Sequence, residues 1–142
     1  MKPIIFLAMS IMSLFMDLRP DFEPGAFFVQ SDIDLMARVV MSEASTQAFE
    51  CKQAVAATIL NRYYSEEFPN DISRVIKGQY STQDNGKPNE DCYAAVYATI
   101  AYRDAFPHNL YYFRNDYYHG FATDYTQIDD LYFSTKGEAH YD

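Results

Sequence analysis

The stretch that decides the fold reads SDIDLMARVVMSEA, over residues 31–44. Its apolar side chains recur every three or four positions, which predicts an amphipathic helix from Asp32 to about Ala44. Ser31 and Asp34 have the spacing of a capping box, which predicts the start of this helix. The helix should therefore turn one apolar stripe toward a core.

One acidic side chain falls on that predicted buried stripe. Glu43 follows Val40 by three positions and Val39 by four, whereas exposed acids normally lie on the opposite face. It also lies in the last turn, where the helix dipole disfavours a negative charge. Partial burial and the dipole both favour a protonated carboxyl group, which makes Glu43 a candidate general acid. A solvated glutamate at the edge of the stripe is the alternative.

Further helices are expected to complete a helical lobe around this one. A second predicted helix covers residues 47–64, and its many alanines suit close packing. Asn70 is expected to cap a short helix that ends at Lys77. Asn89 is expected to cap a third long helix that ends at about Arg103. The part of the domain that precedes Pro107 should therefore be mainly helical.

After Pro107 the sequence changes to aromatic runs that are typical of strands. Residues 110–113 read LYYF and residues 131–133 read LYF, and we expect a loop between them. The predicted fold class is therefore α+β, mainly helical, with a helical lobe followed by a small C-terminal β lobe. A cleft between two such lobes would suit a long polymer substrate.

The first 30 residues are expected to lie outside the domain that residues 31–142 form. The apolar run over residues 4–16 follows Lys2 and is shorter than the roughly 20 residues of a spanning helix. It fits an export signal or an anchor. A first helix packed on the domain is the alternative. Residues 20–30, with two prolines and a glycine, have the composition of a linker.

Composition excludes several classes of protein. The 142 residues carry 11 Lys and Arg against 20 Asp and Glu, a net charge of −9, so a nucleic-acid partner is not expected. The 49% of hydrophobic residues can form a core, which excludes a disordered tail. Two cysteines are too few for a disulfide framework or a cysteine-based zinc site. We expect a monomer.

Several segments in a fixed order together resemble one known family. They read ARVVMSEA at 37–44, AVAATILNR at 54–62, FPN at 68–70, YS at 80–81 and LYYFRN at 110–115. In this order they resemble the SleB-type cell wall hydrolases, which include spore cortex-lytic enzymes and related phage and bacterial peptidoglycan hydrolases. Each segment alone is weak evidence for the family, so the specificity of the resemblance lies in the order of the segments. The resemblance covers most of the chain from Asp32 onward.

The resemblance implies a lysozyme-like domain that cleaves the glycan bond between N-acetylmuramic acid and N-acetylglucosamine. The family's catalytic acid falls on Glu43. The implied partner is the peptidoglycan glycan strand, and the implied location is the periplasm or cell wall, or release during phage lysis. No cofactor and no metal are expected.

The mechanism has two versions at this point. A lytic transglycosylase needs a single acid. Because Glu43 is the one convincing acid in the pattern, the sequence favours this reaction. A muramidase-type hydrolase of the same bond needs a second carboxylate. The candidates for it are Asp84, Asp116 and Asp124, which all lie in predicted loops.

Six residues are candidates for binding the glycan, each with a plainer alternative. Asn61 and Arg62 end the second predicted helix and could instead cap it. Tyr80 and Ser81 could simply form a turn with a packed ring. Tyr111 and Tyr112 alternate along a predicted strand, and most strand aromatics belong to the core.

Two other functional classes and one covalent link stay open. A metal-dependent hydrolase would use His108, His119 and His140, although their spacing matches no known ligand motif. A glycan-binding module without catalysis would use the tyrosine-rich β lobe. Cys51 and Cys92 could form a disulfide if the protein is exported, or remain two buried thiols.

Overall fold

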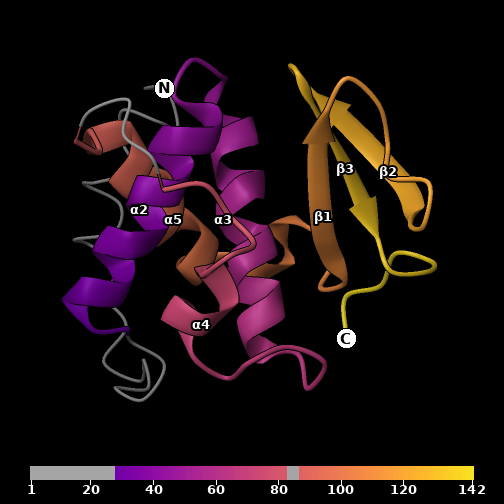
Figure 1. Cartoon of the computed structure of the whole chain (residues 1–142), viewed down its shortest axis with the longest axis horizontal. Coiled ribbons are helices and arrows are strands. Elements are labelled where there is room, and N and C mark those ends of the chain that lie inside the picture. The colour runs from indigo at the N-terminus through magenta and orange to yellow at the C-terminus, as the bar shows by residue number, and fades with distance from the viewer. Residues whose placement is uncertain (1–27, 83–86) are drawn as a thin grey trace.

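The computed structural model describes residues 28–82 and 87–142, which form a helical lobe beside a small sheet (Figure 1). The predictions for the apolar run at 4–16 and for Asp84 fall outside these residues. Within the described part of the chain, no helix combines the length and apolar character needed to cross a membrane.

Helix α3 (Phe49–Tyr64) is the centre of the helical lobe. It contacts α2 (Gln30–Ala44), α5 (Glu90–Ala101), the short α4 (Ile72–Ile76) and the sheet. Every residue from 54 to 62 is buried, because neighbours cover α3 on all sides. A 3₁₀ turn, η2 (Arg103–Ala105), leads from α5 toward the sheet.

The β lobe is a three-stranded antiparallel sheet of order β1-β3-β2. Strand β1 (Leu110–Asn115) faces α3, whereas β2 (Thr123–Ile128) and β3 (Leu131–Thr135) form a hairpin behind it (Figure 1). The predicted α+β class, with the helical lobe first, is confirmed. The predicted loop between the aromatic runs was wrong over β2. That strand is an edge strand whose side chains are mostly exposed, so it lacks the run of buried apolar residues that marked the other two strands.

The start of α2 differs from the predicted capping box. The helix begins at Gln30, with Val29 in the cap position and no side-chain cap, so Ser31 lies inside the helix. Asp34 instead accepts hydrogen bonds from Gln30 Nε2 (2.9 Å) and from the Tyr93 hydroxyl (2.8 Å). The capping-box prediction was wrong because these side-chain partners compete for the same carboxylate.

Of the two other predicted caps, one is confirmed and one is wrong. Asn89 caps α5 and accepts from the Cys92 backbone N–H at 3.1 Å, as predicted. Asp71, rather than Asn70, caps α4 and accepts from two backbone N–H groups of its first turn. The one-residue difference lengthens the loop before α4.

The β2–β3 turn caps α3 from the other lobe. Asp129, whose φ of 51° lies in the left-handed region, accepts from the Ala48 backbone N–H through Oδ2 at 2.6 Å. Ala48 is the N-cap position of α3 and has no side chain that can do this. Beside it, Gln47 exchanges two hydrogen bonds with Asp130 (3.3 and 3.2 Å). The turn therefore holds the β lobe against the start of α3.

The two cysteines are free thiols in this structure, so the possible disulfide between Cys51 and Cys92 is not formed. Cys51 Sγ donates to the Ile128 carbonyl oxygen (3.6 Å), whereas Cys92 Sγ donates to Met41 Sδ (3.7 Å). The sulfur atoms therefore face different elements, β2 and α2. Burial raises the pKa of both thiols, to about 12 for Cys51.

Candidate active site

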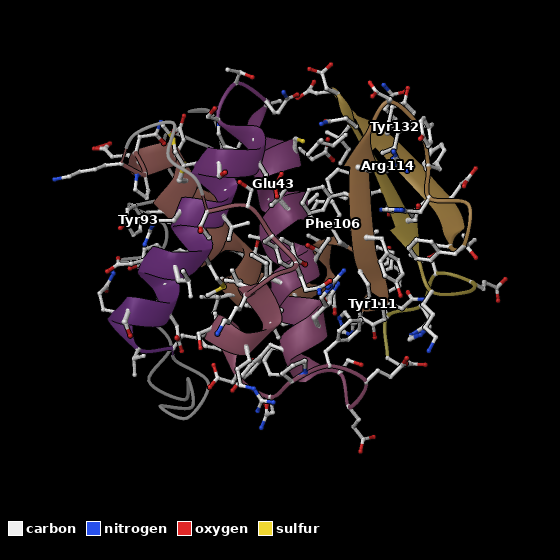
Figure 2. The ribbon with its side chains drawn as sticks, viewed as in Figure 1. Glu43, Tyr93, Phe106, Tyr111, Arg114 and Tyr132 are labelled. Carbon is white, nitrogen blue, oxygen red and sulfur yellow. The ribbon has the colours of Figure 1, made fainter. Side chains whose placement is uncertain are left out.

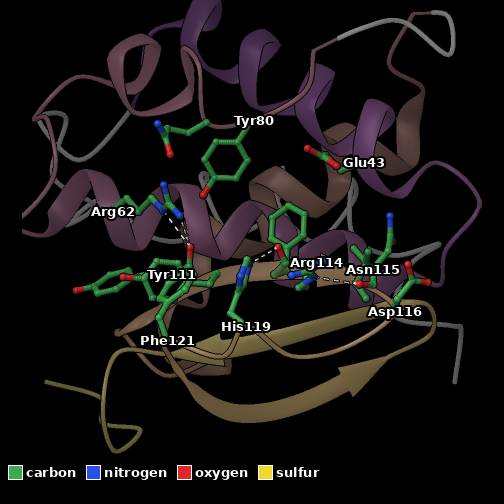
Figure 3. Close-up of a pocket in the computed structure, with 13 residues that line it drawn as sticks. Glu43, Arg62, Tyr80, Tyr111, Arg114, Asn115, Asp116, His119 and Phe121 are labelled. Atoms are coloured by element: carbon green, nitrogen blue, oxygen red, sulfur yellow. Dashed lines mark hydrogen bonds between the residues drawn. The ribbon is translucent and has the colours of Figure 1, made fainter.

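A cleft of about 560 Å³ lies between the helical lobe and β1 (Figure 3). Glu43 borders it from α2, and β1 supplies the facing wall, so the two lobes build the cleft together. Figure 2 shows Glu43 on the helical lobe and Arg114 on β1. The side chains that line the cleft are Glu43, Arg62, Gln79, Tyr80, Tyr111, Tyr112, Phe113, Arg114, Asn115, Asp116, His119, Phe121 and Leu131.

Glu43 is held in place by the segment that follows α4. Its Oε2 accepts a hydrogen bond from the Ser81 backbone N–H at 2.9 Å. The hydroxyls of Ser42 and Ser81 are 2.6 Å apart, which ties the same segment to the last turn of α2. The 80–81 turn therefore positions the Glu43 carboxyl group. Ser81 reaches Glu43 through its backbone and is not a lining residue.

Tyr80 forms part of the helical wall beside Glu43. Its hydroxyl lies 2.9 Å from Thr58 Oγ1, and its ring lies 5.9 Å from that of Phe113. Burial raises the pKa of Tyr80 to about 12, so the phenol remains neutral over the working range of most proteins. Tyr80 lines the cleft.

Arg62 lines the cleft but is only 9% exposed, because its guanidinium group is used internally. Nε and Nη2 both donate to the Tyr111 carbonyl oxygen, at 3.0 and 2.8 Å. The group also lies over the rings of Phe68, Tyr80 and Tyr112, at 4.8, 5.2 and 5.5 Å from their centroids. It therefore joins α3 to β1 and supports three aromatic rings around the cleft.

Asn61, one of the predicted glycan contacts, is not among the residues that line the cleft. It is 3% exposed, and Nδ2 donates to the carbonyl oxygens of Pro107 (2.9 Å) and Leu110 (3.0 Å). Its Oδ1 accepts from Arg103 Nη2 at 3.1 Å. All of these partners lie after α5, so Asn61 fastens the chain entering β1 to α3 and does not cap α3.

Tyr111 and Tyr112 both line the cleft but differ in exposure. Tyr111 is buried at 7% and packs on Phe68, with ring centroids 5.0 Å apart. Tyr112 is half-buried, and its neighbours are His119 (6.0 Å) and Phe121 (5.1 Å). Tyr112 is therefore the better placed of the two to meet a ligand.

The end of β1 and the loop after it contribute lining residues that were not among the predicted glycan contacts, and His119 was considered only as a metal ligand. Arg114, Asn115, His119 and Phe121 belong to this group, with Gln79 and Leu131 from elsewhere. The signal that could have found them is the aromatic segment YYHGF at 117–121.

Among the candidates for a second carboxylate, Asp116 lines the cleft, whereas Asp124 lies on the exposed strand β2 and does not. Asp116 has a φ of 75°, in the left-handed region at the turn that ends β1.

The three histidines do not converge. His108 Nε2 lies 2.7 Å from Asp104, His119 Nε2 lies 3.2 Å from the Phe113 carbonyl oxygen, and His140 is exposed near the C-terminus. Within residues 28–82 and 87–142, no group of three or more histidine, cysteine or acidic side chains could hold a metal ion.

Comparisons with known proteins place this geometry in a family. A model of the cell wall hydrolase family matches residues 46–134. The chain belongs to the cell wall hydrolase family. The matched residues begin just after Glu43 and include all the other residues that line the cleft.

Relatives of this cell wall hydrolase include two spore cortex-lytic enzymes. That of Bacillus subtilis is 38% identical over 66% of this chain and 32% of its own length. That of Bacillus cereus is 38% identical over 63% of this chain and 37% of its own length. The chain therefore spans about a third of the length of the curated relatives it matches.

Two solved structures are similar to this cell wall hydrolase. The catalytic domain of the Bacillus cereus SleB protein superposes with a TM-score of 0.66 at 26% identity, over 82% of this chain and 98% of that one. The catalytic domain of the germination-specific lytic transglycosylase SleB from Bacillus anthracis gives 0.67 at 28%, over 76% and 97%. These matches confirm the expected family and the α+β fold class.

Proposed function

We propose that this cell wall hydrolase cleaves peptidoglycan glycan strands between N-acetylmuramic acid and N-acetylglucosamine, with Glu43 as the general acid. The observation that carries the proposal is the position of Glu43. Its carboxyl group borders a cleft between two lobes, and the Ser81 N–H fixes its Oε2 at 2.9 Å. Because Oε2 accepts that bond, Oε1 is the oxygen that would carry the proton to a leaving group.

The favoured reaction is that of a lytic transglycosylase. Glu43 protonates the glycosidic oxygen as its bond to the muramic anomeric carbon breaks. The carboxylate then takes the proton from the muramic 6-hydroxyl while that oxygen attacks the same carbon, which leaves a 1,6-anhydro end. No water is consumed and Glu43 regains its proton, so one carboxyl group is sufficient. The name of the Bacillus anthracis structure supports this reaction.

A muramidase-type hydrolase is the second candidate, and the position of Asp116 favours it. Asp116 lines the same cleft as Glu43, and Figure 3 shows both toward one end of it. In hydrolysis, a second carboxylate activates water or forms a covalent intermediate. The product would then be a reducing muramic end.

The deciding experiment compares the wild type with Glu43→Gln and Asp116→Asn on purified peptidoglycan. Glu43→Gln keeps the shape of the side chain and removes its titratable proton, so fragment release should fall at least about a hundredfold. A transglycosylase should keep anhydro products in Asp116→Asn, whereas a hydrolase should lose activity. Binding to peptidoglycan without fragment release by the wild type would point to a glycan-binding module. Loss of activity to a chelator would contradict the metal-free mechanism.

We further propose that residues 31–142 are the catalytic domain, and that residues 1–30 serve as an export signal or anchor and linker. The protein would then act at the cell wall, after export or during phage lysis, as a monomer without cofactor. The names of the spore cortex-lytic relatives support a wall location.

A further inference from the structure

We infer that Phe121 is a stacking platform for an N-acetylhexosamine ring of the glycan strand, at a subsite remote from the bond that Glu43 cleaves. This inference rests on the proposed function and adds a residue that neither the catalytic proposal nor the comparisons assign. It begins from an unusual exposure. Phe121 lines the cleft and is 72% exposed, the highest value among the large apolar side chains in the described part of the chain.

The ring of Phe121 is supported from the side by two other rings. Tyr112 meets it at 5.1 Å with an interplanar angle of 84°, and His119 meets it at 4.7 Å and 43°. Most of its surface still faces solvent. Exposed phenyl surface in a cleft gains free energy when an apolar face covers it. A pyranose ring presents such a face of axial C–H groups.

The loop that carries Phe121 is held to β1. His119 Nε2 lies 3.2 Å from the Phe113 carbonyl oxygen, and the Ala122 N–H donates to the His119 carbonyl oxygen at 3.4 Å. The ring of Tyr118 packs edge-on against Tyr132 of β3 at 5.0 Å. The platform is therefore positioned before a ligand arrives, which lowers the entropy cost of binding.

The place of Phe121 in the cleft indicates which part of the strand it would meet. Figure 3 shows Phe121 and Tyr111 toward one end of the cleft, and Glu43 and Asp116 toward the other. When the bond to be cleaved lies at Glu43, the sugar that contacts Phe121 would therefore be another sugar of the same strand.

The net charge of the protein also favours binding of the strand by stacking. The protein carries a net charge of −9, so non-specific attraction cannot hold it on an anionic wall. Stacking on a neutral ring is independent of net charge and could hold the strand during repeated cleavage.

The test uses the absence of tryptophan from the chain. In a Glu43→Gln background, Phe121→Trp places the sole tryptophan on the proposed platform. Tyr141→Trp places it on a control ring that is 48% exposed and does not line the cleft. The probe is peptide-free glycan strands of alternating N-acetylglucosamine and N-acetylmuramic acid. Emission of Phe121→Trp should shift on titration, whereas emission of Tyr141→Trp should not.

Calorimetry measures the contribution of the ring to binding. In the same background, Phe121→Ala should bind the strands about tenfold more weakly, a usual effect of truncating an aromatic anchor, and Tyr141→Ala should bind as the parent does. Circular dichroism should show both variants folded, since neither ring is buried. Equal affinity of Phe121→Ala and the parent, or an unchanged Phe121→Trp spectrum, would overturn the platform.

The wild type, incubated with the same strands, separates the two proposals. If it releases fragments while Phe121→Ala binds normally, the platform fails and the function stands. If it releases none while binding depends on Phe121, the platform stands and the catalytic proposal fails.

Discussion

Arg62 offers a direct test of how the cleft is built, because the structure uses it as a link between the lobes. The pairing of β1 with β3 shifts register between Leu110 and Tyr112, so Tyr111 has no partner in β3. The Tyr111 carbonyl oxygen accepts both Arg62 donors instead. Replacing Arg62 by Met retains an apolar stem among the rings and removes both donors.

The expected cost follows from these contacts. Hydrogen bonds to a charged group contribute about 1.5–3 kcal/mol, and a buried carbonyl left unpaired costs about 1–3 kcal/mol. We therefore expect Arg62→Met to lower the free energy of unfolding by about 3 kcal/mol. For a domain of this size that corresponds to a fall in Tm of about 10–15 °C. Arg62→Lys keeps the charge but lacks the planar fork, so it should lose about half as much.

Urea unfolding followed by circular dichroism measures these differences, with Lys77→Met on the exposed end of α4 as the matched control. The control should unfold within about 0.5 kcal/mol of the wild type. A loss below about 1 kcal/mol in Arg62→Met, together with a raised KM on peptidoglycan, would refute the structural role. Arg62 would then be a ligand of the substrate, the alternative that the sequence left open.

Three further predictions concern stability and reactivity. Asp129→Ala removes the cap that the β lobe provides to α3, so it should cost about 1 kcal/mol in urea unfolding, and an unchanged midpoint would contradict the cap. Cys51 and Cys92 should react slowly with iodoacetamide in the native protein and fully in denaturant, because burial raises the pKa of both thiols; rapid native labelling seen by intact mass would show otherwise. Burial raises the pKa of Tyr80 to about 12. The contribution of the neutral phenol to folding stability is therefore complete below pH of about 10 and is lost as the pH rises toward 12. Stability of Tyr80→Phe should therefore fall less steeply than that of the wild type over that range, and parallel pH curves would count against a buried phenol.

The helical lobe was largely predictable because local signals and burial agree there. The run of apolar and small residues over 54–62 predicted the central helix, and Asn89 predicted the start of α5. Glu43 was selected because it breaks the pattern of an apolar stripe, and the structure places it at the cleft. A break in a local pattern is visible in sequence.

The remaining features depend on contacts between segments far apart in the chain. The role of Asn61 comes from carbonyl groups near residue 110, and that of Arg62 from a register shift within β1. Strand β2 depends on pairing with β3, since its own side chains are mostly exposed. Phe121 enters the cleft through the ring contacts of a loop. No periodicity in the sequence reports such contacts.

The most direct test of the central claim is mass spectrometry of the fragments that the wild type and Glu43→Gln release from purified peptidoglycan. The account predicts wild-type fragments with 1,6-anhydro-muramic ends and at least about a hundredfold less of them from Glu43→Gln. Reducing muramic ends would contradict the single-acid reaction and direct attention to Asp116. Release by Glu43→Gln above a tenth of the wild-type level would contradict the assignment of Glu43 as the catalytic acid.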